Sequence, residues 1–255
     1  MIFGVSTLGC PGLPLDRVGA LLRRHGVRAV QLRCAEDEPV HVGIDAAARR
    51  AARRRLGDDG LVLLGLATYV TLSAGAAGLA EHLELAHDLG APALRLMPGG
   101  EGDPQAHLAY AAQTLAEAAV RAQGSGVRLL VETHDAFLRG EDLARLLVTA
   151  GAGPSVGAVW DALHPWRSGE APARTAAALG PWLGEVQVKD VATPARRTPL
   201  VPGTGTVPIR EVLAEARAAG FTGPVVLEHE ARWYPDAAPI GDAIDGARNL
   251  VLTSR

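Results

Sequence analysis

Short apolar runs that end in polar residues alternate along this chain with longer segments of helical periodicity. In residues 128–135 three aliphatic residues precede Glu132, and His134 follows two positions later. A short apolar run bounded by charge is typical of a strand buried on both faces, the kind found in parallel sheets covered by helices. Eight such runs occur, at residues 2–6, 29–33, 61–67, 93–97, 128–135, 155–161, 185–190 and 224–230.

The segments between these runs predict helices, and most of them end at a glycine, as helices commonly do. The predicted helices cover residues 17–25, 45–56, 76–89, 104–123, 141–149, 172–179, 209–219 and 242–252. Eight strands alternating with helices predict an α/β fold, a (β/α)8 TIM barrel, and the 255 residues match its usual length of about 250. We therefore expect a single domain over residues 1–255, with its active site at the carboxyl ends of the strands.

Four oxygen-bearing side chains stand at the ends of the last four strand-like runs. Gaps of 29, 26 and 41 residues separate the members of this set, Glu132, Asp161, Gln187 and Glu228. One βα unit takes roughly 30 residues, and the gap of 41 fits one unit with a longer loop, so each member belongs to a successive strand. Such oxygen donors predict a site for one divalent cation, Mn²⁺ or Mg²⁺ before Co²⁺ or Zn²⁺. A cation there would polarise a carbonyl group, and Glu132 and Glu228 could serve as paired general base and acid.

Lysine is used once in the chain. Of the 25 positive charges, 24 are arginines and the remaining one is Lys189, at the end of a predicted strand beside the candidate ligands. A lysine offers a compact ammonium group whose pKa can be tuned, which arginine does not. We expect Lys189 either to bind a substrate oxygen or to hold a carboxylate.

Composition argues against several classes of protein. The net charge of −3 does not fit a general nucleic-acid binder, and the arginine-rich helix predicted at residues 45–56 has no interleaved aromatic residues. With 48% hydrophobic residues and a mean hydropathy of +0.12, no apolar run reaches the roughly 18 residues of a membrane span.

The N-terminal sequence and the number of cysteines bear on the location of the protein and on its redox state. The chain begins directly with a predicted strand and shows no basic segment ahead of a long apolar one, so a cytoplasmic location is expected. The two cysteines, Cys10 and Cys34, are too few for a disulfide framework, and we expect both to be reduced.

Five short segments carry motifs in a recognisable order. They are Glu-Thr-His at 132–134, Asp-Ala-Leu-His at 161–164, Val-Gln-Val-Lys-Asp at 186–190, Pro-Gly-Thr-Gly-Thr-Val-Pro at 202–208 and Val-Leu-Glu-His-Glu at 226–230. In these motifs the chain resembles the xylose isomerase-like TIM barrel superfamily. More narrowly, it resembles the sugar phosphate isomerase/epimerase branch, which includes ketose 3-epimerases and inosose dehydratases.

This resemblance implies roles for individual residues. It implies metal ligation by Glu132, Asp161 and Glu228, with the two glutamates exchanging protons in epimerase members. It also implies that His164 contacts a substrate oxygen. The family's usual ligand on the seventh strand is histidine, and this chain has Gln187 there. An amide oxygen can bind a hard cation, but more weakly, so Gln187 is either a ligand or a hydrogen-bonding neighbour of the site.

Further candidates for substrate binding lie near the same strand ends. His134 follows Glu132 at a position expected to face substrate, while Arg33 and Arg95 could hold a phosphate or carboxylate group or neutralise the site. Aromatic side chains could provide a wall for a sugar ring or pack in the core, and these are Trp160, Trp166, Trp233 and Tyr69. His229 alternates away from Glu228 and is expected to be structural.

The function predicted from these residues is isomerisation or epimerisation of a sugar, sugar phosphate or cyclic polyol ketone. A lyase of the inosose dehydratase kind would use the same proton abstraction. Two other classes are an abasic-site endonuclease, which needs more histidine ligands, and a metal-free sugar-binding protein in which Gln187 marks a lost metal site. The expected partner is a small carbohydrate, and because such barrels often pair through outer helices, a homodimer is left open.

Overall fold

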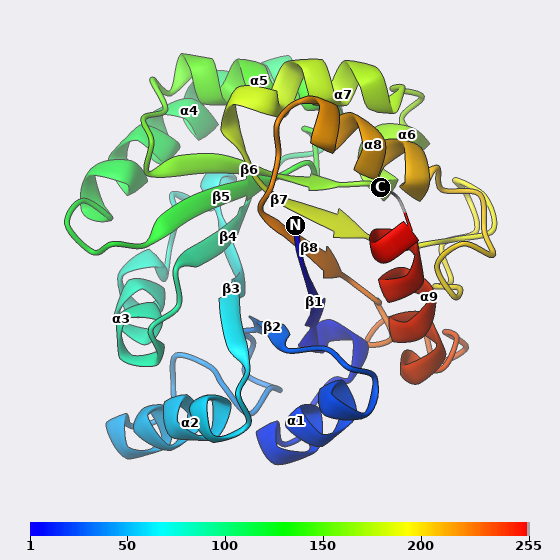
Figure 1. Cartoon of the computed structure of the whole chain (residues 1–255). Coiled ribbons are helices and arrows are strands. Elements are labelled where there is room, and N and C mark those ends of the chain that lie inside the picture. The colour runs from blue at the N-terminus through cyan, green and yellow to red at the C-terminus, as the bar shows by residue number, and fades with distance from the viewer. Residues whose placement is uncertain (254–255) are drawn as a thin grey trace.

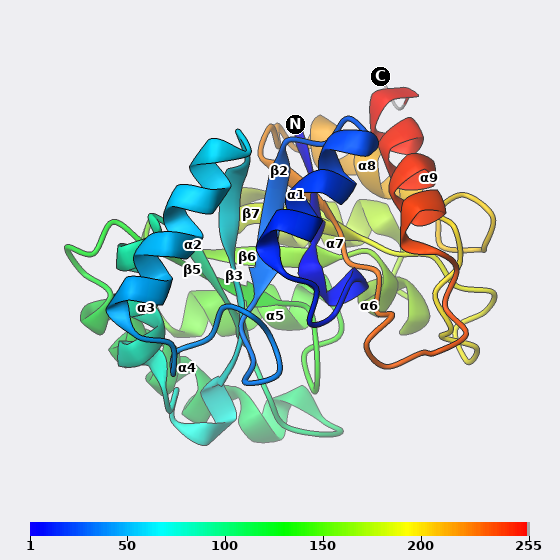
Figure 2. The same ribbon diagram turned by 90° about the horizontal axis from the view of Figure 1, so that it is seen from below.

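The computed structural model describes residues 1–253 and contains a closed parallel barrel of eight strands (Figures 1 and 2). Each strand pairs with the next one in the sequence, and β8 pairs with β1. The strands are β1 Ile2–Ser6, β2 Ala29–Arg33, β3 Val62–Thr71, β4 Ala93–Met97, β5 Arg128–Glu132, β6 Val156–Asp161, β7 Leu183–Val188 and β8 Pro224–Leu227. The predicted (β/α)8 TIM barrel is confirmed.

The helices surround the barrel, as Figure 1 shows. They are α1 Leu15–Arg24, α2 Ala46–Asp58, α3 Leu79–Leu89, α4 Pro104–Arg121, α5 Gly140–Thr149, α6 Leu163–Arg167, α7 Pro172–Leu179, α8 Ile209–Ala218 and α9 Ile240–Thr253, with short 3₁₀ turns at Thr7–Gly9, Leu72–Ala74 and Gly180–Trp182. The N-terminus and the end of α9 lie on the same side of the barrel (Figure 2). Over residues 1–253, no helix has the length and apolar character needed to cross a membrane.

On β5 and β6, the side chains that face the barrel interior change from apolar to charged toward the end of the strand. Leu130 on β5, Val159 on β6 and Val226 on β8 are buried in the two small apolar clusters inside the barrel. Successive side chains on a strand point to opposite faces, so the residue two positions later points inward again. That residue is Glu132 on β5 and Asp161 on β6. The same alternation that fills the barrel therefore directs carboxylates into its mouth.

The main hydrophobic core lies between the sheet and the helices. Outward-facing strand residues such as Leu129 and Val131 belong to this cluster, together with Trp160, which is 1% exposed. The possibility that Trp160 lines a sugar site is therefore wrong. Its indole alternates away from the inward-facing Asp161 and packs in the core.

The structure differs locally from the predicted elements at three helices. Helix α3 begins at Leu79 and not at residue 76, because Ala76 and Gly78 have positive φ angles of 53° and 78°, which a right-handed helix does not accept. Helix α1 begins at Leu15, directly after Pro14, and so includes Asp16 in its first turn. The short helix α6, which begins two residues after Asp161, was not predicted.

Candidate functional site

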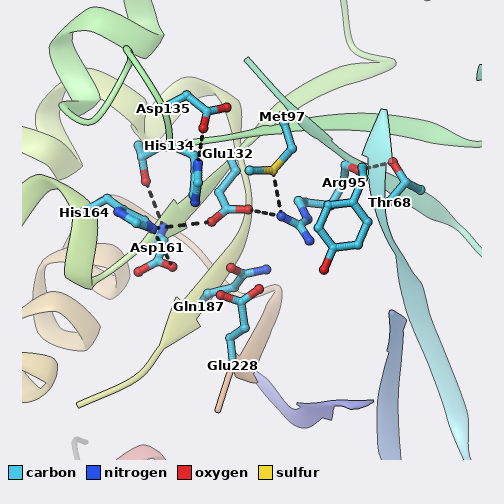
Figure 3. A network of polar contacts seen from close by, with 12 residues as sticks. Thr68, Arg95, Met97, Glu132, His134, Asp135, Asp161, His164, Gln187 and Glu228 are labelled. Atoms are coloured by element: carbon cyan, nitrogen blue, oxygen red, sulfur yellow. Dashed lines mark hydrogen bonds and ion pairs between the residues drawn. The ribbon is translucent and has the colours of Figure 1, made fainter. Parts of the chain in front are cut away.

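Three carboxylates from different strands meet in the mouth of the barrel (Figure 3). Glu132 ends β5, Asp161 ends β6, and Glu228 directly follows β8. All three side chains are buried, and one ligand atom from each lies within 4.8 Å of the others. The sequence-based prediction that these residues converge agrees with this geometry. Gathering buried carboxylates in this way requires compensating positive charge.

Part of that charge comes from Arg95 on β4. Its Nη1 donates to Glu132 Oε2 at 2.7 Å and contacts Met97 Sδ at 2.8 Å (Figure 3). Although burial of Arg95 would lower its pKa, the charges of Glu132 and Glu228 raise it, so the guanidinium stays charged. Arg95 thus fixes one oxygen of Glu132 and leaves the other facing the site.

The remaining charge comes from Lys189, the lone lysine of the sequence. Its Nζ lies 2.7 Å from Asp161 Oδ2 and 2.6 Å from Glu228 Oε2, and it also donates to Glu230. Burial alone would lower the pKa of Lys189, but these carboxylates raise it well above its usual value. Lys189 is therefore an internal cation that contacts the carboxylates of Asp161, Glu228 and Glu230.

The ammonium group affects its two buried partners differently. Burial raises the pKa of Asp161 to about 7, against the opposing charge of Lys189. Burial also acts to raise the pKa of Glu228, but the ammonium of Lys189 and the guanidinium of Arg95 outweigh it and lower that pKa. The ammonium of Lys189 therefore favours the ionised form of both carboxylates, and burial outweighs it only at Asp161.

Two histidines face Glu132 from the ends of β5 and β6. Their rings form an edge-to-face pair with centroids 4.5 Å apart. His134 Nδ1 is hydrogen bonded to Asp135 Oδ1 at 2.7 Å (Figure 3), and this bond, with the charge of Glu132, raises the pKa of His134 against the effect of burial. His164 is buried, and burial followed by the charge of Lys189 lowers its pKa well below the usual value.

Gln187 occupies the position where the related family usually has histidine. Its Nε2 donates to Glu185 Oε1 at 2.9 Å, and Gln31 Nε2 donates to both oxygens of the same carboxylate at 2.7 and 2.9 Å. Within residues 1–253, the Oε1 atoms of Gln187 and Gln31 have no hydrogen-bond partner although both are buried. Glu185 therefore holds the amide nitrogen of Gln187, and the amide oxygen of Gln187 is left free to bind a cation.

Glu185 was absent from the predicted site. A signal was present, since Glu185 stands two residues before Gln187 and therefore on the same face of β7. Burial raises the pKa of Glu185 to about 7, although the hydrogen bonds from Gln187 and Gln31 oppose this shift. A carboxyl group below the mouth thus controls the orientation of the predicted ligand above it.

Because the pKa of Glu185 rises from 4.5 to about 7 on folding, the folded state holds a proton that the unfolded state has released. The free energy of unfolding should fall as the pH rises between these two pKa values, 4.5 and about 7. The loss from this group should be on the order of 3 kcal/mol. Glu185→Gln should remove this dependence and be more stable than the wild type above pH 7. Urea unfolding at pH 5 and pH 8 measures both effects. An equal loss between these pH values in the two proteins would contradict this assignment.

Arg33 is held at the rim of the barrel by its own neighbours. Its guanidinium donates to Tyr69 Oη at 2.7 Å, Glu38 Oε1 at 2.6 Å and Asp37 Oδ1 at 2.9 Å. It also lies over the ring of Trp233, 5.6 Å from the centroid. Arg33 therefore links the loop after β2 to the loop after β8. Its predicted contact with substrate stays a prediction.

Two other motif residues have structural roles. His229 Nε2 is hydrogen bonded to the carbonyl of Ala238 at 2.7 Å, in agreement with its expected structural role. The Gly-Thr-Gly loop surrounds the buried carboxylate of Asp190, which accepts hydrogen bonds from the N–H groups of Gly203 and Gly205 at 2.7 and 2.9 Å. These N–H groups are occupied by Asp190, so the loop is an internal brace.

Comparison with solved structures shows the same fold. The IolI protein with a bound zinc atom matches with a TM-score of 0.84 at 15% identity, over 100% of this chain and 99% of that chain. A probable 3-DHS dehydratase, AsbF from Bacillus anthracis, matches with a TM-score of 0.80 at 18% identity, over the full length of both chains. D-psicose 3-epimerase from Clostridium cellulolyticum H10, solved with D-tagatose, matches with a TM-score of 0.77 at 13% identity, over 98% and 99% of the two chains.

The sequence itself gives a family assignment. No curated protein sequence matches significantly. The profile of the xylose isomerase-like TIM barrel family, however, matches residues 20–250, which is most of the chain. The closed barrel and the motifs at its strand ends agree with that match. The chain therefore belongs to the xylose isomerase-like TIM barrel family.

Proposed function

We propose that this protein is a divalent-metal-dependent isomerase or epimerase of a sugar, a sugar phosphate or a cyclic polyol ketone. The observation that carries the proposal is the buried set of Glu132, Asp161 and Glu228, whose ligand atoms lie within 4.8 Å of one another. Membership of the family supports it, as does the similarity of fold to a D-psicose 3-epimerase.

The cation would be held by Glu132, Asp161 and Glu228, with Gln187 Oε1 as a neutral fourth donor. The donors fit a hard cation such as Mn²⁺ or Mg²⁺ better than a thiolate-seeking metal, because all of them are oxygens. The buried amide oxygen of Gln187 is without a hydrogen-bond partner in residues 1–253, so it is free for this role. When bound, the cation would polarise the substrate carbonyl and acidify the adjacent C–H bond.

Proton transfer is assigned to the two glutamates. Glu228 is kept ionised by the ammonium of Lys189, which suits it to remove the proton. Glu132, on a strand separated from β8 by β6 and β7, would return the proton from another side of the substrate. His134 and His164 would contact substrate oxygens, and Arg33 would hold an anionic substituent of the substrate. Lys189 and Arg95 are already paired with carboxylates. Each would therefore contact substrate only in addition to the carboxylates that it holds.

A lyase is the second candidate, and His134 favours it. Loss of water next to a carbonyl needs a further acid for the leaving hydroxyl group. The side chain of His134 is 32% exposed, and its pKa is raised because Asp135 and Glu132 outweigh the effect of burial. A protonated imidazole at the open side of the site could supply that proton.

Proton exchange with solvent is the reaction to test. The protein, loaded with Mn²⁺, would be incubated in D₂O with a panel of ketoses, their phosphates and cyclic polyol ketones, and followed by NMR. We expect deuterium at the carbon next to the carbonyl of at least one substrate. The product then distinguishes an epimer or isomer from a dehydrated ketone. Binding without any exchange across the panel would favour a sugar-binding protein.

A further inference from the structure

Three side chains on the β5 and β6 side of the mouth each have a ligand atom without a hydrogen-bond partner in the described part of the chain, residues 1–253. Glu132 Oε2 accepts from Arg95, while Oε1 faces His164 Nε2 at 4.0 Å. His134 uses Nδ1 in its hydrogen bond to Asp135, which leaves Nε2 available. Neither ring nitrogen of the buried His164 has a hydrogen-bond partner among residues 1–253, although Nε2 also lies 3.6 Å from Asp161 Oδ2. Burying polar atoms without partners is costly, so the two ring nitrogens of His164 call for a binding partner that Arg95, which is paired with Glu132 Oε2, does not supply.

The opposite side of the mouth is already compensated. Asp161 and Glu228 lie 2.7 and 2.6 Å from Nζ of Lys189. Gln187 gives its amide nitrogen to Glu185 and offers only a neutral oxygen. A cation bound by this side alone would have to compete with the ammonium group. A cation bound at the histidine side would meet ligand atoms that have no hydrogen-bond partner within residues 1–253.

We propose that Glu132, His134 and His164 form a nitrogen-rich cation site of their own, next to the acidic set and sharing Glu132 with it. One ligand atom from each of the three lies within 4.8 Å of the others. Two imidazoles and one carboxylate suit a borderline ion such as Zn²⁺, Co²⁺ or Cu²⁺ rather than Mg²⁺.

The surroundings of His134 support this assignment. Histidines that bind metals commonly donate their other ring N–H to a carboxylate, which fixes the ring and its tautomer. Asp135 is in this position, and its second oxygen accepts the N–H of Gly99 at 2.9 Å. Asp135 also has a positive φ of 52°, a conformation uncommon for a residue other than glycine. The backbone thus accepts strain where the carboxylate orients His134.

This site goes beyond the proposed function, because it requires no sugar turnover. It also offers a replacement for the histidine that the related family has on the seventh strand and that this chain lacks. The nitrogen donors of the mouth would come from the β5 and β6 ends, where His134 and His164 stand, and not from position 187. If His134 and His164 bind a cation, the contacts with substrate oxygens expected of them, and the acid role of His134 in a lyase, must be supplied by other groups.

The test is electron paramagnetic resonance of the tag-free, metal-stripped protein with one equivalent of Cu²⁺. We expect hyperfine coupling from two imidazole nitrogens. His134→Gln and His164→Gln should each remove one nitrogen and weaken Cu²⁺ binding by at least about tenfold. Asp161→Asn, in the acidic set, and His82→Gln, on the outer helix α3, should keep both nitrogens.

The wild-type spectrum alone can overturn the proposal. Bound Cu²⁺ without imidazole coupling would place the ion in the acidic set, and an absence of binding would also exclude the site. Coupling that survives in both histidine variants would assign the nitrogens to other residues. These outcomes are separate from the proposed function, because failure of every substrate to exchange deuterium leaves the Cu²⁺ spectrum unchanged.

Discussion

Glu228→Gln should slow deuterium exchange at the substrate carbon by roughly 10²–10⁴-fold, the usual contribution of a positioned acid or base. The amide keeps the size of the carboxylate but cannot accept the proton. In the wild type, Lys189 and Arg95 lower the pKa of Glu228 despite its burial, so the reactive form predominates at neutral pH. The rate is measured by NMR in D₂O at saturating substrate.

Glu230→Gln is the matched control for this change. Glu230 stands two residues further along the chain and also accepts a hydrogen bond from Lys189, but it lies outside the set of three carboxylates. We expect its exchange rate to fall by less than about tenfold, within the range of an altered neighbouring charge. A large loss in Glu230→Gln together with a near-normal rate in Glu228→Gln would show that the base is misassigned.

Lys189→Met should lower the free energy of unfolding of the metal-free protein by about 3–5 kcal/mol near pH 8, the cost of leaving a buried charge without its partner. Lys189 Nζ is within 2.7 Å of both Asp161 and Glu228, and these side chains are at most 4% exposed. Removing the ammonium leaves both carboxylates with less compensation. Urea unfolding measures the loss, and added Mn²⁺ should recover part of it.

The double variant Lys189→Met/Glu228→Gln provides the control. It removes one positive and one negative charge, so it should be less destabilised than the sum of the two single variants. Additive effects, or a Lys189→Met protein as stable as the wild type in the absence of metal, would mean that Lys189 does not balance the carboxylates.

The barrel and the position of its site could be predicted because both follow from side-chain alternation. Val159 and Asp161 are two residues apart on β6, so a strand that packs an apolar residue inside the barrel must also point the next polar one inward. The eight apolar runs and the convergence of Glu132, Asp161 and Glu228 therefore follow from pattern alone. The bounds of α3 did not, because the left-handed turn at Ala76 lies within a sequence of ordinary helix formers.

The connections within the site could not be predicted from the pattern. Lys189 reaches Glu228 across 39 positions of sequence, and which of several carboxylates it contacts depends on rotamers and strand stagger. The orientation of the Gln187 amide likewise depends on Glu185, a buried residue whose partner Gln31 lies 154 positions away. The spacing in the sequence predicted which residues gather in the mouth. Which of their atoms form hydrogen bonds, and which stay free to bind a cation, could be seen only from their positions in three dimensions.

The most direct test of a cation-dependent acid–base site is the deuterium exchange of one protein preparation before chelation, after chelation and after restoring Mn²⁺. A cation that polarises the carbonyl contributes several kcal/mol, so chelation should lower the exchange rate by about 100-fold or more and Mn²⁺ should restore it. Exchange that continues unchanged in the fully metal-stripped protein would contradict a cation-dependent reaction. It would assign the polarisation of the substrate carbonyl to Lys189.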